Sequence, residues 1–288
     1  MLRRITLTLA LAVAPLVAQI PQTPEDLIAR NLGPRDQVNK AFPPHKIIGN
    51  VYYVGSQALG TFLITTPEGH ILINSDYEVT VPVIKAGIEQ LGFKFTDIKI
   101  LLGSHAHGDH MEGDAMIKEL SGARVMAMEQ DVPALQAMKP GGKAHPIDRV
   151  FKDGDTVTLG GMTLTAHLTP GHTKGCTTWT FKAQENGKSY DVVIVGSAGV
   201  NPGVKLVGNA DYPAIAADFV RTFSILRSLP CDVPLGSHPG MYNMAAKFPN
   251  VGKGPNPYID PEGYRIEIDT NDAVFYRVLA AQKKAAGQ

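Results

Sequence analysis

Short apolar runs alternate with helical patterns along most of the chain. The runs that predict strands lie at residues 51–53, 61–65, 70–74, 98–102, 123–128, 156–159, 162–168, 177–181, 190–195 and 233–236. The patterns that predict helices lie at residues 80–92, 114–120, 213–229 and 260–284. Pro82 and Pro261 mark two of the helix starts, because proline is favoured in the first turn of a helix.

The order of these elements predicts the fold class. Helices distributed around mostly buried strands predict two β-sheets packed between helical layers, which is a four-layer αββα sandwich of the α+β class. Residues 19–45 are rich in Pro and Gln, and we expect them to pack as an irregular arm. No repeat, low-complexity linker or charge run divides the chain, so residues 19–288 are predicted to form a single domain.

The first 18 residues have the pattern of a secretory signal peptide. Arg3 and Arg4 precede an almost wholly apolar run, and small residues at Ala14 and Ala18 suit a signal peptidase that cleaves after Ala18. The run falls short of the roughly 20 residues that span a bilayer, although an N-terminal membrane anchor is the alternative. The sequence therefore predicts a secreted protein, periplasmic in a Gram-negative cell, with no membrane association after processing.

Composition argues against a nucleic-acid-binding protein. Hydrophobic residues make up 44% of the chain and charged residues 19%, which is ordinary for a globular protein. The formal net charge is zero, so the broad basic surface that nucleic acids require is absent from the composition. Nothing in the pattern indicates an oligomeric state.

The stretch that carries chemistry is residues 105–110, His-Ala-His-Gly-Asp-His, directly after an apolar strand. Burying polar groups without partners costs about 1–3 kcal/mol each, so water or a metal ion must satisfy these side chains. Zn²⁺ suits imidazole nitrogen. In a tight turn, His105 and His107 can point one way while Asp109 and His110 point another. This spacing predicts two adjacent metal ions, with solvated loop histidines as the alternative.

Two further histidines stand in similar settings. His172 directly follows the predicted strand at residues 162–168, and His238 follows the strand at residues 233–236. Taken singly, each histidine could equally be structural. Strands that end at one sheet edge deliver the residues that follow them to one place, so both are predicted to join the first cluster as metal ligands.

The remaining histidines are not predicted to be metal ligands. His45, His70 and His145 are isolated, beside proline or in turns, and are predicted to be solvated. His167 shares a strand face with threonines. It is not predicted as a ligand, and a hydrogen bond to a ligand is its alternative role.

Three motifs together resemble the metallo-β-lactamase superfamily: residues 105–110, Thr-Pro-Gly-His-Thr at 169–173, and Ser-His-Pro-Gly at 237–240. The resemblance runs from about residue 47 to the C-terminus and implies the αββα fold. Ser197 stands where many dinuclear relatives place a metal-bridging Asp and two β-lactamase subclasses place a Cys ligand. With the intact first motif, this serine resembles the third subclass of class B β-lactamases, as do the segments 229–233 and 257–265.

This resemblance implies two Zn²⁺ ions per chain and assigns six ligands to them. The ligands of the first zinc would be His105, His107 and His172. The ligands of the second zinc would be Asp109, His110 and His238. A zinc-bound hydroxide would complete the first site, in keeping with the open position that catalytic zinc sites require.

The resemblance also bears on the substrate-binding residues and the cysteines. Ser197 would hold the substrate carboxylate, alone or with Lys205, while Gly199 stands where many relatives carry a second serine. Some relatives pair a cysteine matching Cys231 with one near the C-terminus, but no later cysteine exists here. Cys176 lies four residues after His172 and is expected to be a buried packing residue, not paired with Cys231.

These expectations predict a metallo-β-lactamase, which opens the amide bond of a small-molecule β-lactam antibiotic. The zinc-bound hydroxide would attack the lactam carbonyl, and Asp109 would orient that hydroxide and is a candidate for relaying its proton to nitrogen. One alternative is a secreted dinuclear zinc hydrolase of another ester, lactone or thioester. A second alternative is a non-catalytic zinc-binding domain. A nuclease is disfavoured by the neutral charge.

Overall fold

The computed structural model describes residues 20–288 and contains two β-sheets. The 7-stranded sheet has the order β1-β2-β3-β4-β5-β6-β7, and the 5-stranded sheet has the order β12-β11-β10-β9-β8. The strands of the first sheet are β1 (His45–Ile48), β2 (Val51–Tyr53), β3 (Phe62–Thr66), β4 (Gly69–Ile73), β5 (Ile98–Leu102), β6 (Arg124–Met128) and β7 (Arg149–Phe151). Those of the second are β8 (Thr156–Leu159), β9 (Met162–Leu168), β10 (Thr177–Glu185), β11 (Lys188–Val195) and β12 (Val233–Gly236).

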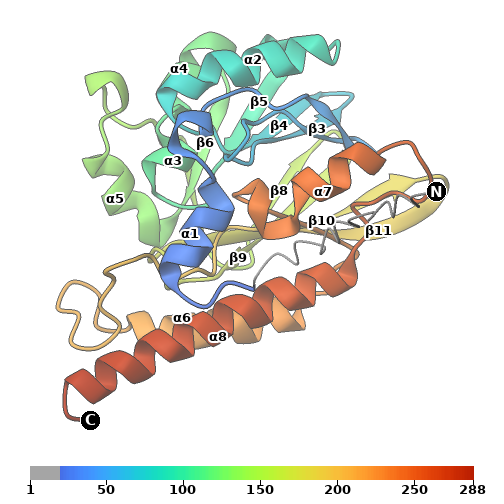
Figure 1. Ribbon diagram of the computed structural model, residues 1–288. Coiled ribbons are helices and arrows are strands. Elements are labelled where there is room, and N and C mark those ends of the chain that lie inside the picture. The colour runs from blue at the N-terminus through green and yellow to red at the C-terminus, as the bar shows by residue number, and fades with distance from the viewer. Residues whose placement is uncertain (1–19) are drawn as a thin grey trace, which may run out of the picture.

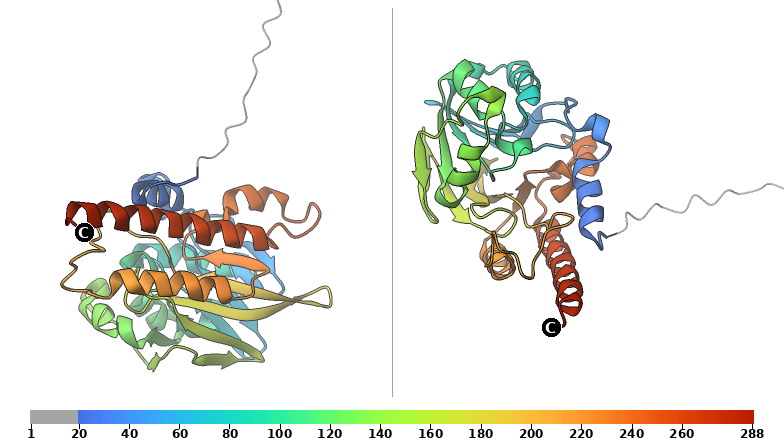
Figure 2. Two further views of the ribbon diagram at one scale, coloured as in Figure 1. Left: turned by 90° about the horizontal axis from the view of Figure 1, so that it is seen from below. Right: turned by 90° about the vertical axis from the view of Figure 1, so that its left-hand side faces the viewer.

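Helices cover the outer faces of both sheets (Figure 1). The helices are α1 (Pro24–Leu32), α2 (Val81–Gln90), α3 (Gly108–Met111), α4 (Asp114–Ser121), α5 (Val132–Ala137), α6 (Ile215–Ser228), α7 (Met244–Lys247) and α8 (Pro261–Ala285). Helices α2 and α4 lie over the first sheet, whereas α6 and α8 run side by side along the second (Figure 2). The predicted four-layer αββα sandwich is confirmed.

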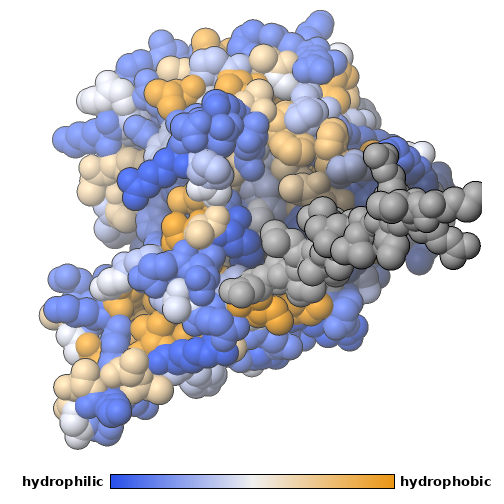
Figure 3. Space-filling view, viewed as in Figure 1, coloured by the Kyte–Doolittle hydropathy of each residue, from blue (hydrophilic) through white to orange (hydrophobic). Residues whose placement is uncertain are grey.

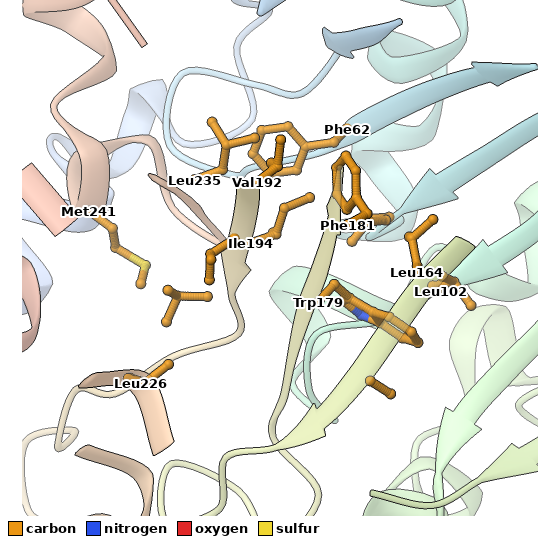
Figure 4. Packing of buried hydrophobic residues seen from close by; sticks show 14 of the residues in the cluster. Phe62, Leu102, Leu164, Trp179, Phe181, Val192, Ile194, Leu226, Leu235 and Met241 are labelled. Carbon is orange, nitrogen blue, oxygen red and sulfur yellow. The ribbon is translucent and has the colours of Figure 1, made fainter. Parts of the chain in front are cut away.

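The main core lies between the two sheets (Figure 4). Phe62 and Leu102 of the first sheet share this core with Trp179 and Ile194 of the second. Burying a large apolar side chain contributes about 1.5–3 kcal/mol, so this core is a main source of the stability of the fold. On the face seen in Figure 3, hydrophilic residues cover most of the surface and hydrophobic ones form smaller patches.

The direction of the strands brings the ends that carry polar motifs to one edge. Strand β4 pairs with β5 in parallel, and β11 pairs with β12 in parallel. The two sheets are tied together at this edge, because the indole of Trp179 donates to the carbonyl of Gly103 at 3.0 Å and the amide of Thr177 donates to Ser104 at 2.8 Å. Segments that follow β4, β5, β9, β11 and β12 therefore meet.

Helix α1 corrects one prediction, because it lies within the expected irregular arm. Thr23 caps it by accepting from the amide of Asp26 at 3.1 Å, and the Asp26 carboxylate accepts from the amide of Thr23 at 3.0 Å. Arg30 then forms two hydrogen bonds with Glu267 of α8, at 2.6 and 2.7 Å. The prolines and glutamines around the helix obscured this capping box in the sequence.

The predicted signal peptide lies outside the described residues. Within residues 20–288, no helix is both long and apolar enough to cross a bilayer. The sequence did not predict several short elements, namely strands β1 and β7 and helices α3, α5 and α7. Each is at most six residues long, which is too short for a clear hydrophobic periodicity.

Candidate metal centre

The motif at residues 105–110 leaves the end of β5 and turns into the short helix α3. His105 is 2% exposed and His110 is fully buried, while His107 and Asp109 are half-buried. The turn places His105 beside both of its histidine neighbours, with ring centroids 4.7 Å from His107 and 4.3 Å from His110.

His172 completes a first group with His105 and His107. One ligand atom from each of the three side chains lies within 4.8 Å of the other two. The ring of His172 is 4.6 Å from that of His105 and 4.9 Å from that of His107. The loop after β9 thus reaches the motif as the sequence predicts.

A second group gathers around Asp109. The Oδ2 atom of Asp109 lies 3.3 Å from Nε2 of His110 and 3.7 Å from Nε2 of His238. The rings of His110 and His238 are 4.8 Å apart. Ligand atoms of His105, Asp109 and His110 also lie within 4.8 Å of one another, so the two groups adjoin.

Several ring nitrogens in this cluster are buried without hydrogen bonds. They are Nε2 of His105 and both ring nitrogens of His110, whose Nε2 approaches Asp109 without making a hydrogen bond. Leaving buried polar groups unpaired is costly, and metal coordination would satisfy them. The donor set of five imidazoles and one carboxylate fits a metal centre such as zinc.

Outer hydrogen bonds orient two of the histidines toward the centre. The Nδ1 atom of His172 lies 2.7 Å from the carbonyl oxygen of Gly199, and Nδ1 of His238 lies 2.9 Å from that of Ala58. A carbonyl oxygen only accepts, so each Nδ1 carries the proton and each Nε2 is left as the free acceptor. Metal-binding histidines are held in this way.

Electrostatics keep the ligand atoms in the forms that bind metal. Burial holds the pKa of His105 well below its ordinary value and lowers the pKa of His172 to about 3 and that of His238 to about 4. Burial alone would raise the pKa of Asp109, but the imidazoles around it, His110 first, outweigh this and hold it well below the usual range. At neutral pH, His105, His172 and His238 are therefore neutral and Asp109 is a carboxylate.

The residues predicted to hold substrate lie in two different settings. Ser197 follows β11 and is buried, with its carbonyl accepting from the Cys176 thiol at 3.4 Å. Because Val195 pairs with Gly236, Ser197 lies close to the segment that carries His238. Lys205 lies exposed in the loop between β11 and α6, and no contact within residues 20–288 joins its ammonium to the cluster.

Gly199 lies close to side chains of helices α8 and α1. A Cβ atom at this position would lie 3.3 Å from Oδ1 of Asn271 and 3.7 Å from a methyl group of Leu27. A serine at this position would therefore require the Asn271 side chain to shift by a few tenths of an ångström. The Gly199 carbonyl still serves the site through its contact with His172.

The two cysteines are unpaired, as predicted. Cys176 is fully buried and Cys231 is half-buried. Burial raises the pKa of both thiols, so neither is activated as a thiolate.

Sequence reasoning missed Asp76, which lies beside the cluster. It follows β4, is fully buried, and its carboxylate has no hydrogen-bond partner within the described part of the chain. Burial raises the pKa of Asp76 to about 7, while the imidazole of His110 and the hydroxyl of Thr61 oppose this increase. Its place after a strand parallel to β5 was the signal that could have identified it.

The prediction that His45, His70 and His145 are solvated is wrong. Each is less than 9% exposed. His45 contacts the hydroxyl of Tyr258 at 2.6 Å, and His70 packs edge-on against Phe93. Half-buried His167 contacts the hydroxyl of Thr180 at 2.8 Å.

His145 forms a buried ion pair behind the metal-binding turn. Its Nε2 atom lies 3.2 Å from Oδ2 of Asp114, whose Oδ1 accepts from the hydroxyl of Ser75 at 2.6 Å. Burial lowers the pKa of His145, but the Asp114 carboxylate beside it and the carbonyls of Met111 and Pro146, which accept from its two ring nitrogens, together outweigh this and raise the pKa above the ordinary value. The pair therefore stabilises the fold below about pH 6.5, and this contribution is lost as the pH rises through the raised pKa.

We expect His145→Gln to lower the free energy of unfolding by about 1.5–3 kcal/mol at pH 6, the usual contribution of a hydrogen bond to a charged group. The loss should be smaller at pH 9, where the wild-type imidazole is neutral. Thermal unfolding of the metal-free proteins at both pH values measures this. His167→Gln is the control, since burial lowers the pKa of His167 and the dependence on pH should not follow that of His145→Gln. An equal loss at pH 6 and pH 9 for His145→Gln contradicts the prediction.

Comparison with known proteins now identifies the family. Residues 61–238 match the model of the metallo-beta-lactamase superfamily, so the chain belongs to this superfamily. The structure of native FEZ-1 metallo-beta-lactamase from Legionella gormanii matches with a TM-score of 0.81 and 48% identity, over 85% of this chain and 98% of that one. BJP-1, a subclass B3 metallo-beta-lactamase of Bradyrhizobium japonicum, matches with a TM-score of 0.81 and 37% identity, over 88% and 99% of the two chains. The similarity to the third subclass is confirmed.

Curated sequence relatives carry a different name and match a shorter segment. A hydroxyacylglutathione hydrolase of Hyphomonas neptunium is 36% identical over 139 residues, which is 48% of this chain and 45% of the relative. Another from Rhodopseudomonas palustris is 35% identical over 112 residues, 39% of each chain. The matches thus span less than half the length of these relatives.

Proposed function

We propose that this protein is a secreted metallo-β-lactamase that hydrolyses the amide bond of β-lactam antibiotics with two zinc ions. The observation that carries the proposal is the buried cluster of six donors, in which ring nitrogens of His105 and His110 have no other partner. Similarity to subclass B3 enzymes along nearly their whole length supports β-lactams as substrates, whereas similarity to the thioester hydrolases is partial.

The proposed first zinc is held by His105, His107 and His172. The proposed second zinc is held by Asp109, His110 and His238. When bound, zinc lowers the pKa of water from 15.7 to about 7 and supplies hydroxide at neutral pH.

The protein side chains then orient the reaction. Asp109 remains a carboxylate in the cluster, so it can accept a hydrogen bond from the attacking hydroxide and orient it. It is also the proposed relay for the proton that the departing lactam nitrogen takes up. The carbonyls of Gly199 and Ala58 hold His172 and His238 in one tautomer. Ser197, directly after β11, is the proposed hydrogen-bond donor to the substrate carboxylate, and exposed Lys205 is a proposed cation that attracts it from farther away.

The proposal includes export to the periplasm, with cleavage after Ala18, and a small-molecule substrate. A hydrolase of a glutathione thioester is the second candidate, and the sequence similarity to hydroxyacylglutathione hydrolases favours it. A non-catalytic zinc-binding domain is the third candidate, and the experiment below distinguishes it from the two hydrolases.

The deciding experiment compares substrates with the purified zinc-loaded protein. We expect a kcat/KM of about 10⁴ M⁻¹s⁻¹ or more, the lower end of the usual enzymatic range, for at least one of a penicillin, a cephalosporin and a carbapenem. A glutathione thioester and an acyl-homoserine lactone should be hydrolysed at least about 100-fold less efficiently. Neither has the lactam nitrogen and the adjacent carboxylate for which the proposed site has contacts. Faster turnover of the thioester overturns the proposal in favour of the second candidate, and no turnover of any substrate favours the third.

A further inference from the structure

Asp131 is a buried carboxylate whose two oxygens each accept hydrogen bonds. It lies in the turn between β6 and α5 and is 3% exposed. Its Oδ2 accepts from the amide of Ala106 and from the hydroxyl of Thr173, both at 2.8 Å. Its Oδ1 accepts from the amide of Gly175 at 2.7 Å. Both oxygens are thus engaged by the protein, and Asp131 belongs to neither of the two groups of candidate metal ligands.

These three donors belong to the two segments that build the first metal group. Ala106 stands between His105 and His107, and Thr173 directly follows His172. The segments are separated from Asp131 by 25 and 42 residues in the chain. One carboxylate therefore joins the β5 turn to the β9 loop at the place where their histidines meet.

The close approach at Gly175 shows that this contact is built into the fold. A Cβ atom at Gly175 would lie 2.5 Å from the amide nitrogen of Asp131 and 2.7 Å from its Cβ. Only glycine allows the β9 loop to lie directly on Asp131. The loop cannot move toward Asp131, and the three hydrogen bonds oppose movement away from it.

We propose that Asp131 is a positioning residue for the first metal group, which holds His172 at a fixed distance from His105 and His107. This inference rests on the metal-binding part of the proposed function and is independent of the substrate. Second-sphere residues of this kind change metal affinity by about 10- to 100-fold when they are altered. The loss should fall mainly on one of the two metal ions, because the hydrogen bonds that Asp131 accepts within residues 20–288 come from the segments of Ala106, Thr173 and Gly175 and not from that of His238.

The test measures zinc affinity of the metal-free protein by competition with a chromophoric chelator. Asp131→Asn replaces one acceptor oxygen by an NH₂ group, which must then face an N–H or the Thr173 hydroxyl. Thr173→Val removes a single hydrogen bond and keeps the side-chain volume, so it is informative even if Asp131→Asn does not fold. Thr173→Ser keeps the hydroxyl and should restore the wild-type affinity. The matched control is Asp232→Asn, whose carboxylate accepts from the amide of Asp191 at the opposite end of the strands.

We expect one stepwise zinc dissociation constant to rise about 10- to 100-fold in Asp131→Asn and several-fold in Thr173→Val, with the other constant changed less than about threefold. In a His172→Ala background, Asp131→Asn should add little, because the residue through which it acts is gone. Asp232→Asn should leave both constants unchanged.

A purely structural role for Asp131 gives a different result. In that case the metal-free variants melt at lower temperature while both zinc constants stay as in the wild type, which overturns the inference. Equal losses from Asp131→Asn with and without His172 also overturn it. If the wild type itself binds no zinc, the proposed function fails together with the inference, whereas a wild type that binds two zinc ions but opens no β-lactam leaves only the function refuted.

Discussion

Removal of metal with EDTA is expected to abolish hydrolysis of a carbapenem, by about 1,000-fold or more, because the water nucleophile then keeps its ordinary pKa of 15.7. No side chain of the cluster can replace it as a nucleophile. His105, His172 and His238 have lowered pKa values and are weak bases, and the only two thiols of the chain have raised pKa values. The rate of carbapenem opening, followed by ultraviolet absorbance before and after dialysis against EDTA, measures the loss.

Zinc added back in slight excess should restore the rate, and this distinguishes metal loss from unfolding. The core between the sheets contains Trp179 and Phe62 and does not involve the cluster, so the metal-free protein should keep its circular dichroism spectrum. A serine-directed β-lactamase inactivator should leave the zinc-loaded enzyme active. Hydrolysis by the stripped protein at the untreated rate would refute the metal-dependent scheme.

The six candidate ligands could be predicted because their signal is local. Residues 105–110 concentrate four donors in six positions, and His172 and His238 each follow a recognisable apolar strand. The rule that strand ends share one sheet edge, together with the family resemblance, predicted that three distant segments meet, and the structure brings them together. The αββα layers could be predicted for a similar reason, since the alternation of strands and helices repeats along the chain.

The surroundings of the site could not be predicted, because they depend on contacts between distant segments. Asp131 looks like any polar residue at a helix start, and only the folded chain brings it against Ala106 and Thr173. The sequence predicts a solvated loop residue at His145, because its partner Asp114 on α4 is 31 residues away in the chain. The close neighbour of Gly199 is Asn271 of helix α8, more than 60 residues away in the sequence.

Asp109→Asn should be the most damaging single substitution in the cluster. The asparagine side chain has the same shape and keeps one carbonyl oxygen as a weaker ligand, but it has no negative charge and cannot accept a proton. Positioned general acid–base groups contribute about 10²–10⁴-fold to rate, so we expect kcat for a carbapenem to decrease by about 10²-fold or more. The loss should appear in kcat more than in KM, since proton acceptance belongs to the transition state.

Zinc content decides how such a loss is interpreted. The Oδ2 atom of Asp109 lies within 4 Å of Nε2 of both His110 and His238, so removing its charge weakens the whole second group. Measured at saturating zinc, with the metal quantified in the same sample, a low kcat at full occupancy assigns the effect to proton transfer and orientation. Glu119→Gln, at an exposed carboxylate of α4, is the control and should retain full activity. An Asp109→Asn enzyme that keeps more than about a tenth of wild-type kcat at full occupancy would show that the proton travels by another group.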